Sequence, residues 1–242
     1  MASRSYDIAA YGERWAAIYD DEVRPEPDAV EFLAARAGRG PALEFAVGTG
    51  RFAIPLIERG IRVDGIDSSE AMATQLRERV PRARVEIGDM ASVDMGRTYP
   101  LVFLVATSLF LLLEQDDQVR CFENAARHLT KRGQFVVNTF VPQPSRFPDG
   151  QTVRASDVSD GGVSLEVAKH DGTRQRVDVQ YVTIDDSGKI ELFPIHLRYA
   201  WPAELDLMAR IAGLKLVDRF GGWRGEPLTD VTPEHVSVYR RA

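Results

Sequence analysis

Between residues 42 and 140, short apolar runs alternate with segments in which apolar residues recur at helical spacing. A strict alternation of strands and helices is typical of a parallel sheet with right-handed connections, so we expect an α/β fold. The intervening segments predict helices, including Arg51–Arg59 and Asp116–Leu129, with Lys131–Gly133 as the turn before the fifth strand. The apolar runs predict buried strands over Ala42–Phe45, Arg62–Asp67, Arg84–Met90, Tyr99–Ala106 and Gln134–Phe140.

The segment before the first strand predicts two helices, so we expect residues 1–40 to form a helical N-terminal cap. Asp28–Ala37 predicts the second helix, which Gly38 and Gly40 end. Tyr6–Asp20 predicts the first, and its apolar stripe is explained as well by core packing as by contact with a ligand. That stripe consists of Ile8, Tyr11, Trp15 and Tyr19.

The pattern changes after Phe140. Val141–Asp160 is rich in proline and predicts a loop or a crossing connection. Three segments of alternating polarity follow, and the hairpin signal His170–Thr173 joins the first two. We expect residues 141–202 to contain an inserted antiparallel sheet that forms a cover over one side of the main sheet's carboxyl edge. The three predicted strands are Leu165–Lys169, Gln175–Ile184 and Lys189–Trp201, and the main fold then resumes with a helix over Glu204–Ala212 and strands over Leu214–Phe220 and Val236–Arg240.

Composition narrows the class of protein. The chain has 242 residues with 44% apolar and 27% charged content, which predicts one globular domain over residues 1–242. A net charge of −6 leaves no basic surplus for a nucleic-acid backbone, so a small-molecule partner is favoured. Cys121 is the only cysteine, and the longest apolar run is shorter than the roughly 20 residues that span a bilayer. We therefore expect a cytoplasmic protein without a membrane segment, as a monomer or homodimer.

Three acidic residues end three successive predicted strands. Glu44, Asp67 and Asp89 should converge at one crevice, because the carboxyl ends of parallel strands share one edge of the sheet. Gly48 and Gly50 form the turn after the first strand, where glycine allows positive φ and a close approach by a ligand. A carboxylate at Asp67 suits the ribose hydroxyls of NAD and of S-adenosylmethionine (SAM) equally. The spacing therefore leaves both cofactors open.

An acid followed by a glycine-rich turn resembles the first motif of the class I SAM-dependent methyltransferases. Glu44, Ala46, Gly48 and Gly50 match this motif, with Ala46 where the family most often has glycine. The resemblance covers Tyr6 to about Phe140 and implies a Rossmann-like seven-stranded sheet with helices on both faces. It implies SAM as the cofactor, with a binding site formed by Tyr11, Tyr19, Glu44, Ala46, Gly48, Thr49, Gly50, Arg51, Asp67, Ser68, Met72, Asp89, Met90 and Ala106.

The expected activity is in-line transfer of a methyl group to a nitrogen or oxygen of a small molecule, similar to enzymes of natural-product and amino-sugar pathways. His196 and Tyr199 on the third inserted strand are the candidate catalytic residues, whereas His170 is explained as a turn residue. No acids or histidines have metal-ligand spacing, so no metal is expected. An NAD-dependent oxidoreductase is an alternative, although the chain turns antiparallel where a second mononucleotide half would begin. The other alternative is a protein that binds the cofactor without catalysing a reaction.

Overall fold

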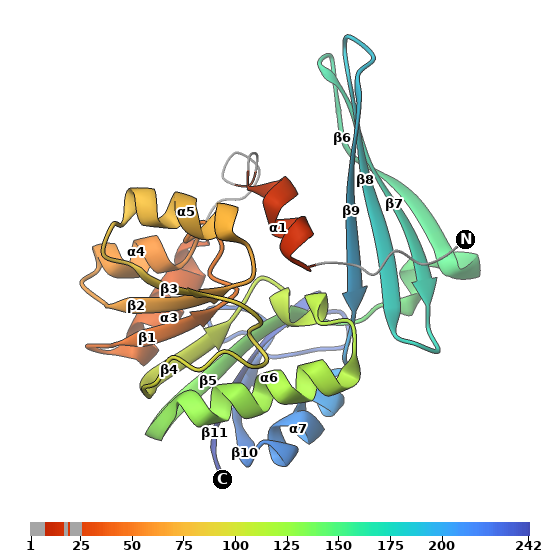
Figure 1. Cartoon of the computed structure of the whole chain (residues 1–242). Helices are drawn as coiled ribbons and strands as arrows, with labels where there is room; N and C mark the ends of the chain where they lie inside the picture. Colours follow the sequence, from red (N-terminus) through yellow and green to blue (C-terminus); the bar gives the residue numbers. More distant parts are fainter. Residues whose placement is uncertain (1–7, 17–18, 20–25) are drawn as a thin grey trace.

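The computed structural model describes residues 8–16, 19 and 26–242, with side chains described from Gly12 onward. Its main body is a seven-stranded sheet in the order β10-β11-β5-β4-β1-β2-β3 (Figure 1). The predicted seven-stranded sheet is confirmed: the pairs among β1 to β5 are parallel, whereas β11 runs antiparallel to β5 and β10. The strands are β1 (Ala42–Phe45), β2 (Val63–Asp67), β3 (Arg84–Ile87), β4 (Tyr99–Leu104), β5 (Leu129–Phe140), β10 (Leu214–Phe220) and β11 (Glu234–Arg241).

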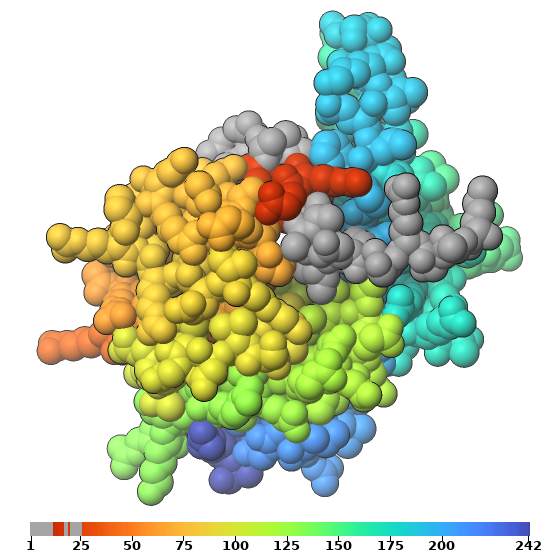
Figure 2. All heavy atoms as spheres, in the orientation of Figure 1, coloured from red at the N-terminus to blue at the C-terminus, as the bar shows by residue number. Residues whose placement is uncertain are grey.

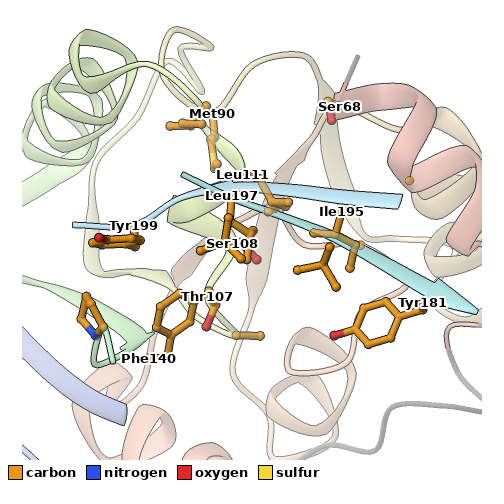
Figure 3. A pocket seen from close by; sticks show the side chains of 18 of the residues that line it. Ser68, Met90, Thr107, Ser108, Leu111, Phe140, Tyr181, Ile195, Leu197 and Tyr199 are labelled. Atoms are coloured by element: carbon orange, nitrogen blue, oxygen red, sulfur yellow. The ribbon is translucent and has the colours of Figure 1, made fainter. Parts of the chain in front are cut away.

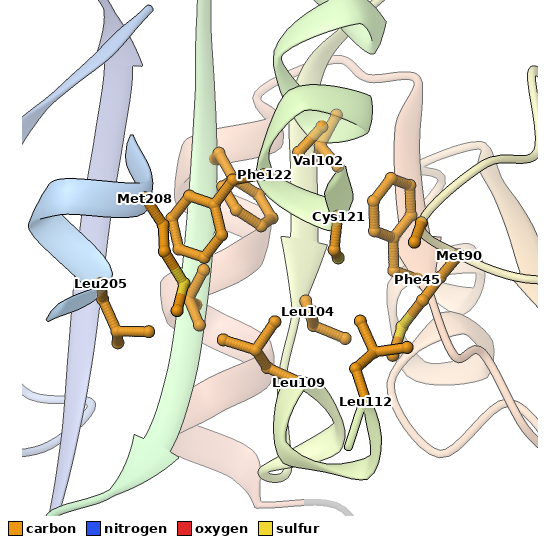
Figure 4. Close-up of a cluster of buried hydrophobic side chains, with 14 of the residues drawn as sticks. Phe45, Met90, Val102, Leu104, Leu109, Leu112, Cys121, Phe122, Leu205 and Met208 are labelled. Atoms are coloured by element: carbon orange, nitrogen blue, oxygen red, sulfur yellow. The ribbon is translucent and has the colours of Figure 1, made fainter. Parts of the chain in front are cut away.

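Helices cover the two faces of this sheet and bury two separate apolar clusters. One cluster receives side chains from α3 (Pro27–Ala37), α4 (Ala53–Glu58) and α5 (Glu70–Arg79). The other receives Cys121 and Phe122 from α6 (Gln115–His128) and Met208 from α7 (Pro202–Ile211) (Figure 4). Because Leu33 of α3 is fully buried in the first cluster, α3 belongs to the core. Among the described residues of the expected cap, α1 (Ile8–Trp15) lies apart from this core cluster.

The inserted region forms an antiparallel sheet of four strands, one more than predicted. β6 (Gln151–Ser159), β7 (Gly162–Asp171), β8 (Arg176–Asp185) and β9 (Ile190–Arg198) pair in chain order. The sequence does not reveal β6, because it is an edge strand whose residues are almost all exposed and therefore lack an apolar alternation. The far end of this sheet projects beyond the main body (Figures 1 and 2).

Two local predictions differ from the structure because strands extend into predicted turns. Lys131–Gly133 lies within β5, where the register with β4 shifts between Tyr99 and Leu101. β7 continues through His170 to Asp171, so the hairpin loop occupies residues 172–175. The second difference places His170 on a face of a sheet, which changes what this side chain can contact.

A buried polar network fixes the base of the inserted sheet to the main body. Arg198 of β9 donates to Gln118 Oε1 of α6 and to Glu204 Oε1 of α7, each at 2.7 Å. Gln175 Nε2, in the β7–β8 loop, donates to Glu204 Oε2 at 2.7 Å. The inserted sheet is thus held to both α6 and α7 by groups that are largely withdrawn from water.

The buried His235 in β11 gives a prediction for stability against pH. Burial and the Arg219 guanidinium lower the pKa of His235 to about 4, from an ordinary value of 6.5. His235 in the folded protein therefore stays neutral at pH values at which the unfolded chain binds a proton. The free energy of unfolding should thus fall as pH drops from 6.5 toward 4. We expect a loss of about 2 to 3 kcal/mol between pH 7.5 and 4.5.

Urea denaturation of the wild-type protein and of His235→Gln across this pH range measures that loss. Glutamine can still hydrogen bond with Thr139 and Ser237, the partners of the imidazole. The variant should lack this part of the pH dependence. Identical slopes for the two proteins would show that His235 is not the responsible group.

Candidate functional site

A cavity of about 750 Å³ lies at the carboxyl ends of the central strands and extends to the inserted sheet (Figure 3). Ala46, Asp67 and Ala106 line it directly after or at the ends of β1, β2 and β4. On the other side it is lined by inserted-sheet residues such as Val179 and Ile195. This volume lies within the range of about 300 to 1,000 Å³ that is usual for small-molecule sites.

The two glycines after β1 serve different purposes. Gly48 has φ +56, and a Cβ added there would meet nothing within 4 Å, so its open side faces the cavity that it lines. Gly50 has φ +92, but a Cβ there would lie 2.6 Å from Leu76 Cδ1. Ala46 also has positive φ, +55, which explains the preference for glycine at that position of the motif. Gly48 therefore makes room for a ligand, whereas Gly50 makes room for α5.

Asp67 ties the end of β2 to this turn. Its carboxylate accepts hydrogen bonds from Gly48 N at 2.7 Å and from Ser69 N at 2.8 Å. Burial raises the pKa of Asp67, and these backbone donors oppose that effect. The Gly48 N–H is therefore directed at Asp67, so the carboxylate that faces the cavity also shapes the turn.

Four of the predicted cofactor residues, Glu44, Thr49, Gly50 and Arg51, do not line the cavity. Glu44 is only 2% exposed, and its Oε2 has no hydrogen-bond partner. Burial, with the nearby Asp67, raises the pKa of Glu44 well above its usual value. The carboxyl group of Glu44 is therefore buried beside Asp67, and its role in cofactor binding stays a prediction.

The remaining predicted cofactor residues lie at the cavity, apart from Tyr11, whose side chain is outside the described part of the structure. Burial raises the pKa of Tyr19, while the Arg51 guanidinium, which also hydrogen bonds to this phenol, lowers it. Asp89 Oδ1 accepts from Ala91 N at 2.8 Å and so fixes the turn after β3. The predicted residues that line the cavity are Tyr19, Ala46, Gly48, Asp67, Ser68, Met72, Asp89, Met90 and Ala106.

Helix α1 bridges the main body and the inserted sheet over this cavity (Figure 1). Gly12 approaches α5 so closely that a Cβ would lie 2.4 Å from Ser69 Cβ. Glu13 Oε1 accepts from Ser69 Oγ at 2.9 Å and from Ala71 N at 3.1 Å. On the other side, the Trp15 ring lies 5.5 Å from that of Phe193 in β9. These contacts hold α1 across the cavity, in the position that a lid over the cavity would occupy.

The inserted sheet presents one mainly apolar surface to the cavity, which we call the inner face. In register, His170 lies opposite Val177, and Val177 lies opposite Leu197. The next rows contain Val179 opposite Ile195, and Glu166 opposite Tyr181. In Figure 3, Tyr199 and Tyr181 lie at opposite ends, with Leu197 and Ile195 between them. The inner face consists of Glu166, His170, Val177, Val179, Tyr181, Ile195 and Leu197.

The structure separates the two residues that the sequence suggested as catalytic. Tyr199 lines the cavity, but His196 points to the opposite face of the inserted sheet, where its Nδ1 lies 2.6 Å from Asp178 Oδ1. The residues beside it, Ile195 and Leu197, take the inner face because successive strand residues alternate. The expectation that His196 contacts the acceptor is corrected by this placement.

The histidine at the cavity is His170, which sequence reasoning had assigned to a turn. Its Nε2 lies 3.0 Å from Tyr199 Oη. Glu166 is also on the inner face and lies 3.7 Å from an Arg146 nitrogen. The alternation of Glu166, Ala168 and His170 was visible in the sequence, but the length of β7 was not. Without that length, His170 could not be placed beside Tyr199.

The described residues contain no group of three or more histidines, cysteines or acids placed to hold a metal ion. Within the same residues, none of the helices has the length and apolar character that crossing a bilayer requires. The cavity lining presents hydroxyl, carboxylate, imidazole, guanidinium, amide and apolar groups as its available chemistry.

Several known proteins with similar sequences or folds are methyltransferases. Residues 42–133 match a family model described as a methyltransferase domain. A cypemycin N-terminal methyltransferase from a Streptomyces species is 28% identical over 207 residues, which is 82% of each chain. The CcbJ methyltransferase from Streptomyces caelestis is 39% identical, covers 98% of this chain and 100% of its own, and has a TM-score of 0.92.

One solved structure with this fold holds SAM. The SAM-bound structure of CalS10, an amino pentose methyltransferase from Micromonospora echinaspora, aligns over the whole length of both chains with a TM-score of 0.70 and 23% identity. The strand order, the motif after β1 and these similarities agree with one another. The chain belongs to the class I SAM-dependent methyltransferases, and SAM is its cofactor.

Proposed function

We propose that this enzyme methylates the nitrogen of a small-molecule amine that has a mainly apolar body. The observation that carries the proposal is one continuous cavity, with Gly48, Asp67 and Asp89 on one side and the apolar inner face on the other. A cofactor and an acceptor can therefore meet in it without a change in the arrangement of the strands.

The residues on the β1–β3 side fit SAM. Gly48 leaves open space next to the turn, and Asp67 and Ser68 end β2 at the cavity, where ribose hydroxyls can be bound. Met72, Gly88 and Met90 supply an apolar lining for an adenine ring, with Asp89 beside it. When bound, SAM supplies a sulfonium methyl group that an amine lone pair can attack. The protein's part is to hold and orient both reactants and to exclude water.

The walls on the acceptor side favour an apolar body over a polyhydroxylated one. Val177, Val179, Ile195 and Leu197 form a continuous aliphatic surface on the inner face. A sugar ring placed there would leave several hydroxyl groups without partners, at a cost of about 1 to 3 kcal/mol for each buried group. Polar side chains occur instead at the two ends, as His170 with Tyr199 and as Glu166 with Tyr181. This arrangement suits an amphipathic amine.

The names of two relatives support nitrogen as the methylated atom. One relative is an N-terminal methyltransferase and another acts on an amino pentose, so amines are acceptors in this family. An amine is itself a nucleophile once neutral. Positioning it in line with the sulfonium can supply roughly 7 to 11 kcal/mol of the barrier, without an activated hydroxyl.

A matched acceptor panel tests the proposal. The enzyme and SAM are incubated with 2-phenylethylamine, 2-phenylethanol and D-glucosamine, and methylated products are measured by mass spectrometry. We expect transfer to the apolar amine, with much less to the alcohol and to the amino sugar. Faster methylation of the alcohol would contradict the choice of nitrogen, and faster methylation of glucosamine would contradict the apolar body.

Asp67→Ala tests the proposed ribose contact. Loss of a hydrogen bond to a charged group should weaken SAM binding by about 1.5 to 3 kcal/mol, or roughly tenfold to a hundredfold, measured by calorimetry. Because Gly48 N and Ser69 N also lose their acceptor, we expect lower stability without SAM as well. Asp67→Asn keeps one carbonyl acceptor and should be less damaging. An unchanged dissociation constant in Asp67→Ala would show that the ribose binds elsewhere.

A further inference from the structure

We propose that Tyr199 and His170 form a proton relay that removes the proton of the amine acceptor. The inference rests on the proposed function, because only an amine acceptor arrives with this proton. It assigns a catalytic role to His170. This residue lies on the inner face, whereas His196 lies on the opposite face of the inserted sheet.

The two side chains are held together and both reach the cavity. His170 Nε2 lies 3.0 Å from Tyr199 Oη, within hydrogen-bonding distance. The imidazole is stacked between two rings, with centroid distances of 4.9 Å to Phe147 and 5.7 Å to Tyr199, each at an interplanar angle of 26°. Trp201 packs its edge against Tyr199 at 6.1 Å. This stack fixes the direction of the hydrogen bond, as a proton relay requires.

The pair lies on the acceptor side of the cavity. His170 is in the row of the inner face that contains Val177 and Leu197, close to the base of the inserted sheet. Tyr199 and Phe140, the last residue of β5, both line the cavity (Figure 3), whereas Asp67 ends β2 and Gly48 and Asp89 follow β1 and β3. An amine placed between these two groups of residues would have SAM on one side and Tyr199 on the other.

The charges around Tyr199 keep it a phenol. Burial raises the pKa of Tyr199, Glu204 of α7 and Asp171 of β7 raise it further, and Arg198 of β9 opposes them. The other charged groups at this cavity on the inserted side are Glu166 and Arg146, which face each other at 3.7 Å. A tyrosine that remains protonated near neutral pH can accept one proton while it donates another, but it cannot act as the base that finally holds the proton. That role belongs to the histidine.

The ammonium form of the acceptor gives a proton to Tyr199 Oη, while the phenolic proton moves to His170 Nε2 and makes an imidazolium. The neutral nitrogen would then attack the methyl group that SAM supplies: an N–C bond forms, the C–S bond breaks with its electron pair left on sulfur, and the positive charge passes to the methylated nitrogen. The imidazolium later releases its proton to water.

The relay matters because free alkylamines are almost entirely protonated at neutral pH. With a pKa of about 10.4, as for a lysine side chain, only about 0.04% is neutral at pH 7, but about a tenth is neutral at pH 9.5. Histidine is the side chain that ordinarily changes protonation state near neutral pH. Loss of the relay should therefore be severe at pH 7 and should be rescued by alkaline solution.

The test measures kcat/KM for 2-phenylethylamine between pH 6.5 and 9.5 in the wild-type protein, His170→Gln and Tyr199→Phe. We expect a loss of about a hundredfold at pH 7 in each variant, and about threefold or less at pH 9.5. The double variant should be no worse than either single one, because both act in one relay. SAM affinity, measured separately, should be unchanged.

Binding of the same amine to the enzyme with S-adenosylhomocysteine gives a readout that does not need turnover. The affinity of His170→Gln for this amine should be reduced at pH 7 and restored at pH 9.5. His196→Gln, on the opposite face of the same sheet, should behave as wild type in both assays.

Three outcomes would overturn the relay. Equal losses at both pH values would make His170 a packing residue, and a profile altered in His196→Gln instead would move the role to the other histidine. Unaltered kcat/KM at pH 7 in His170→Gln would remove it from the chemistry. Failure of the wild-type enzyme to bind or methylate any amine would instead contradict the proposed function itself.

Discussion

Gly48→Val is expected to weaken SAM binding by at least about a hundredfold, which corresponds to about 2.7 kcal/mol. Gly48 lines the cavity with φ +56, and its Cβ position is empty to 4 Å. A valine there would send two methyl groups into the space that the cofactor's methionine end is proposed to occupy. The turn could still fold, but the space beside it would no longer admit SAM.

Backbone strain adds a second, separable effect. An L-residue in the left-handed region costs roughly 1 to 2 kcal/mol, so Gly48→Val should also unfold more easily without SAM. Gly96→Val is the matched control, because Gly96 has φ +66, open space around its Cβ position and an exposed place outside the cavity. It should show the same order of destabilisation with normal SAM affinity.

Calorimetric titration with SAM, together with urea denaturation of both variants, separates the two effects. If Gly48→Val and Gly96→Val lose affinity equally, the loss comes from strain and not from occupied space. If Gly48→Val binds SAM normally, the cofactor does not lie against this turn.

The cofactor side could be predicted from the sequence because it depends on chain direction alone. Parallel strands place their carboxyl ends at one edge, so Asp67 and Asp89 meet there whatever the details of packing. The sequence could not show that Asp67 also accepts from Gly48 N, since this bond requires the bend of the turn. Nor could it show that the Glu44 side chain is buried and does not line the cavity.

The acceptor side depends on strand register, which the sequence specifies weakly. His196 and His170 both lie in strands of alternating polarity, and a difference of one residue decides which face a side chain takes. The pairing of His170 with Val177 and of Asp178 with His196 settles this for both histidines. Strand β6 has no apolar alternation to reveal it, because neither of its faces is buried.

The strongest effect on stability is expected from Arg198→Met. Arg198 and Glu204 are joined at 2.7 Å, with side chains only 8% and 16% exposed. Removing one partner of a buried ion pair costs about 3 to 5 kcal/mol, because the other charge remains buried without compensation. Gln118 Oε1 loses its donor as well, so the inserted sheet loses one side-chain contact with α6 and its ion pair with α7, although Gln175 still donates to Glu204. Thermal unfolding should begin about 10 °C lower, or more.

Arg176→Met is the matched control for this prediction. Arg176 of β8 also joins the inserted sheet to the main body, through Glu114 at 2.6 Å, but these side chains are 31% and 69% exposed. An exposed pair contributes about 0 to 1 kcal/mol, so this variant should be nearly as stable as wild type. Equal losses in the two variants would show that burial is not what makes the Arg198 contact important.

The pH dependence of the difference identifies Glu204 as the partner. Burial alone would raise the pKa of Glu204, but hydrogen bonds from Gln175, Arg198 and Gln115 outweigh it and lower the pKa. A carboxyl group whose folded pKa is lowered stabilises the protein above its unfolded pKa of about 4.3, and that contribution is lost as pH falls through the folded value. The stability difference between wild type and Arg198→Met should therefore be full at pH 7 and shrink below about pH 4. A difference that stays constant down to pH 3 would mean that Arg198 stabilises the base of the inserted sheet through Gln118 and packing, and not through the Glu204 carboxylate.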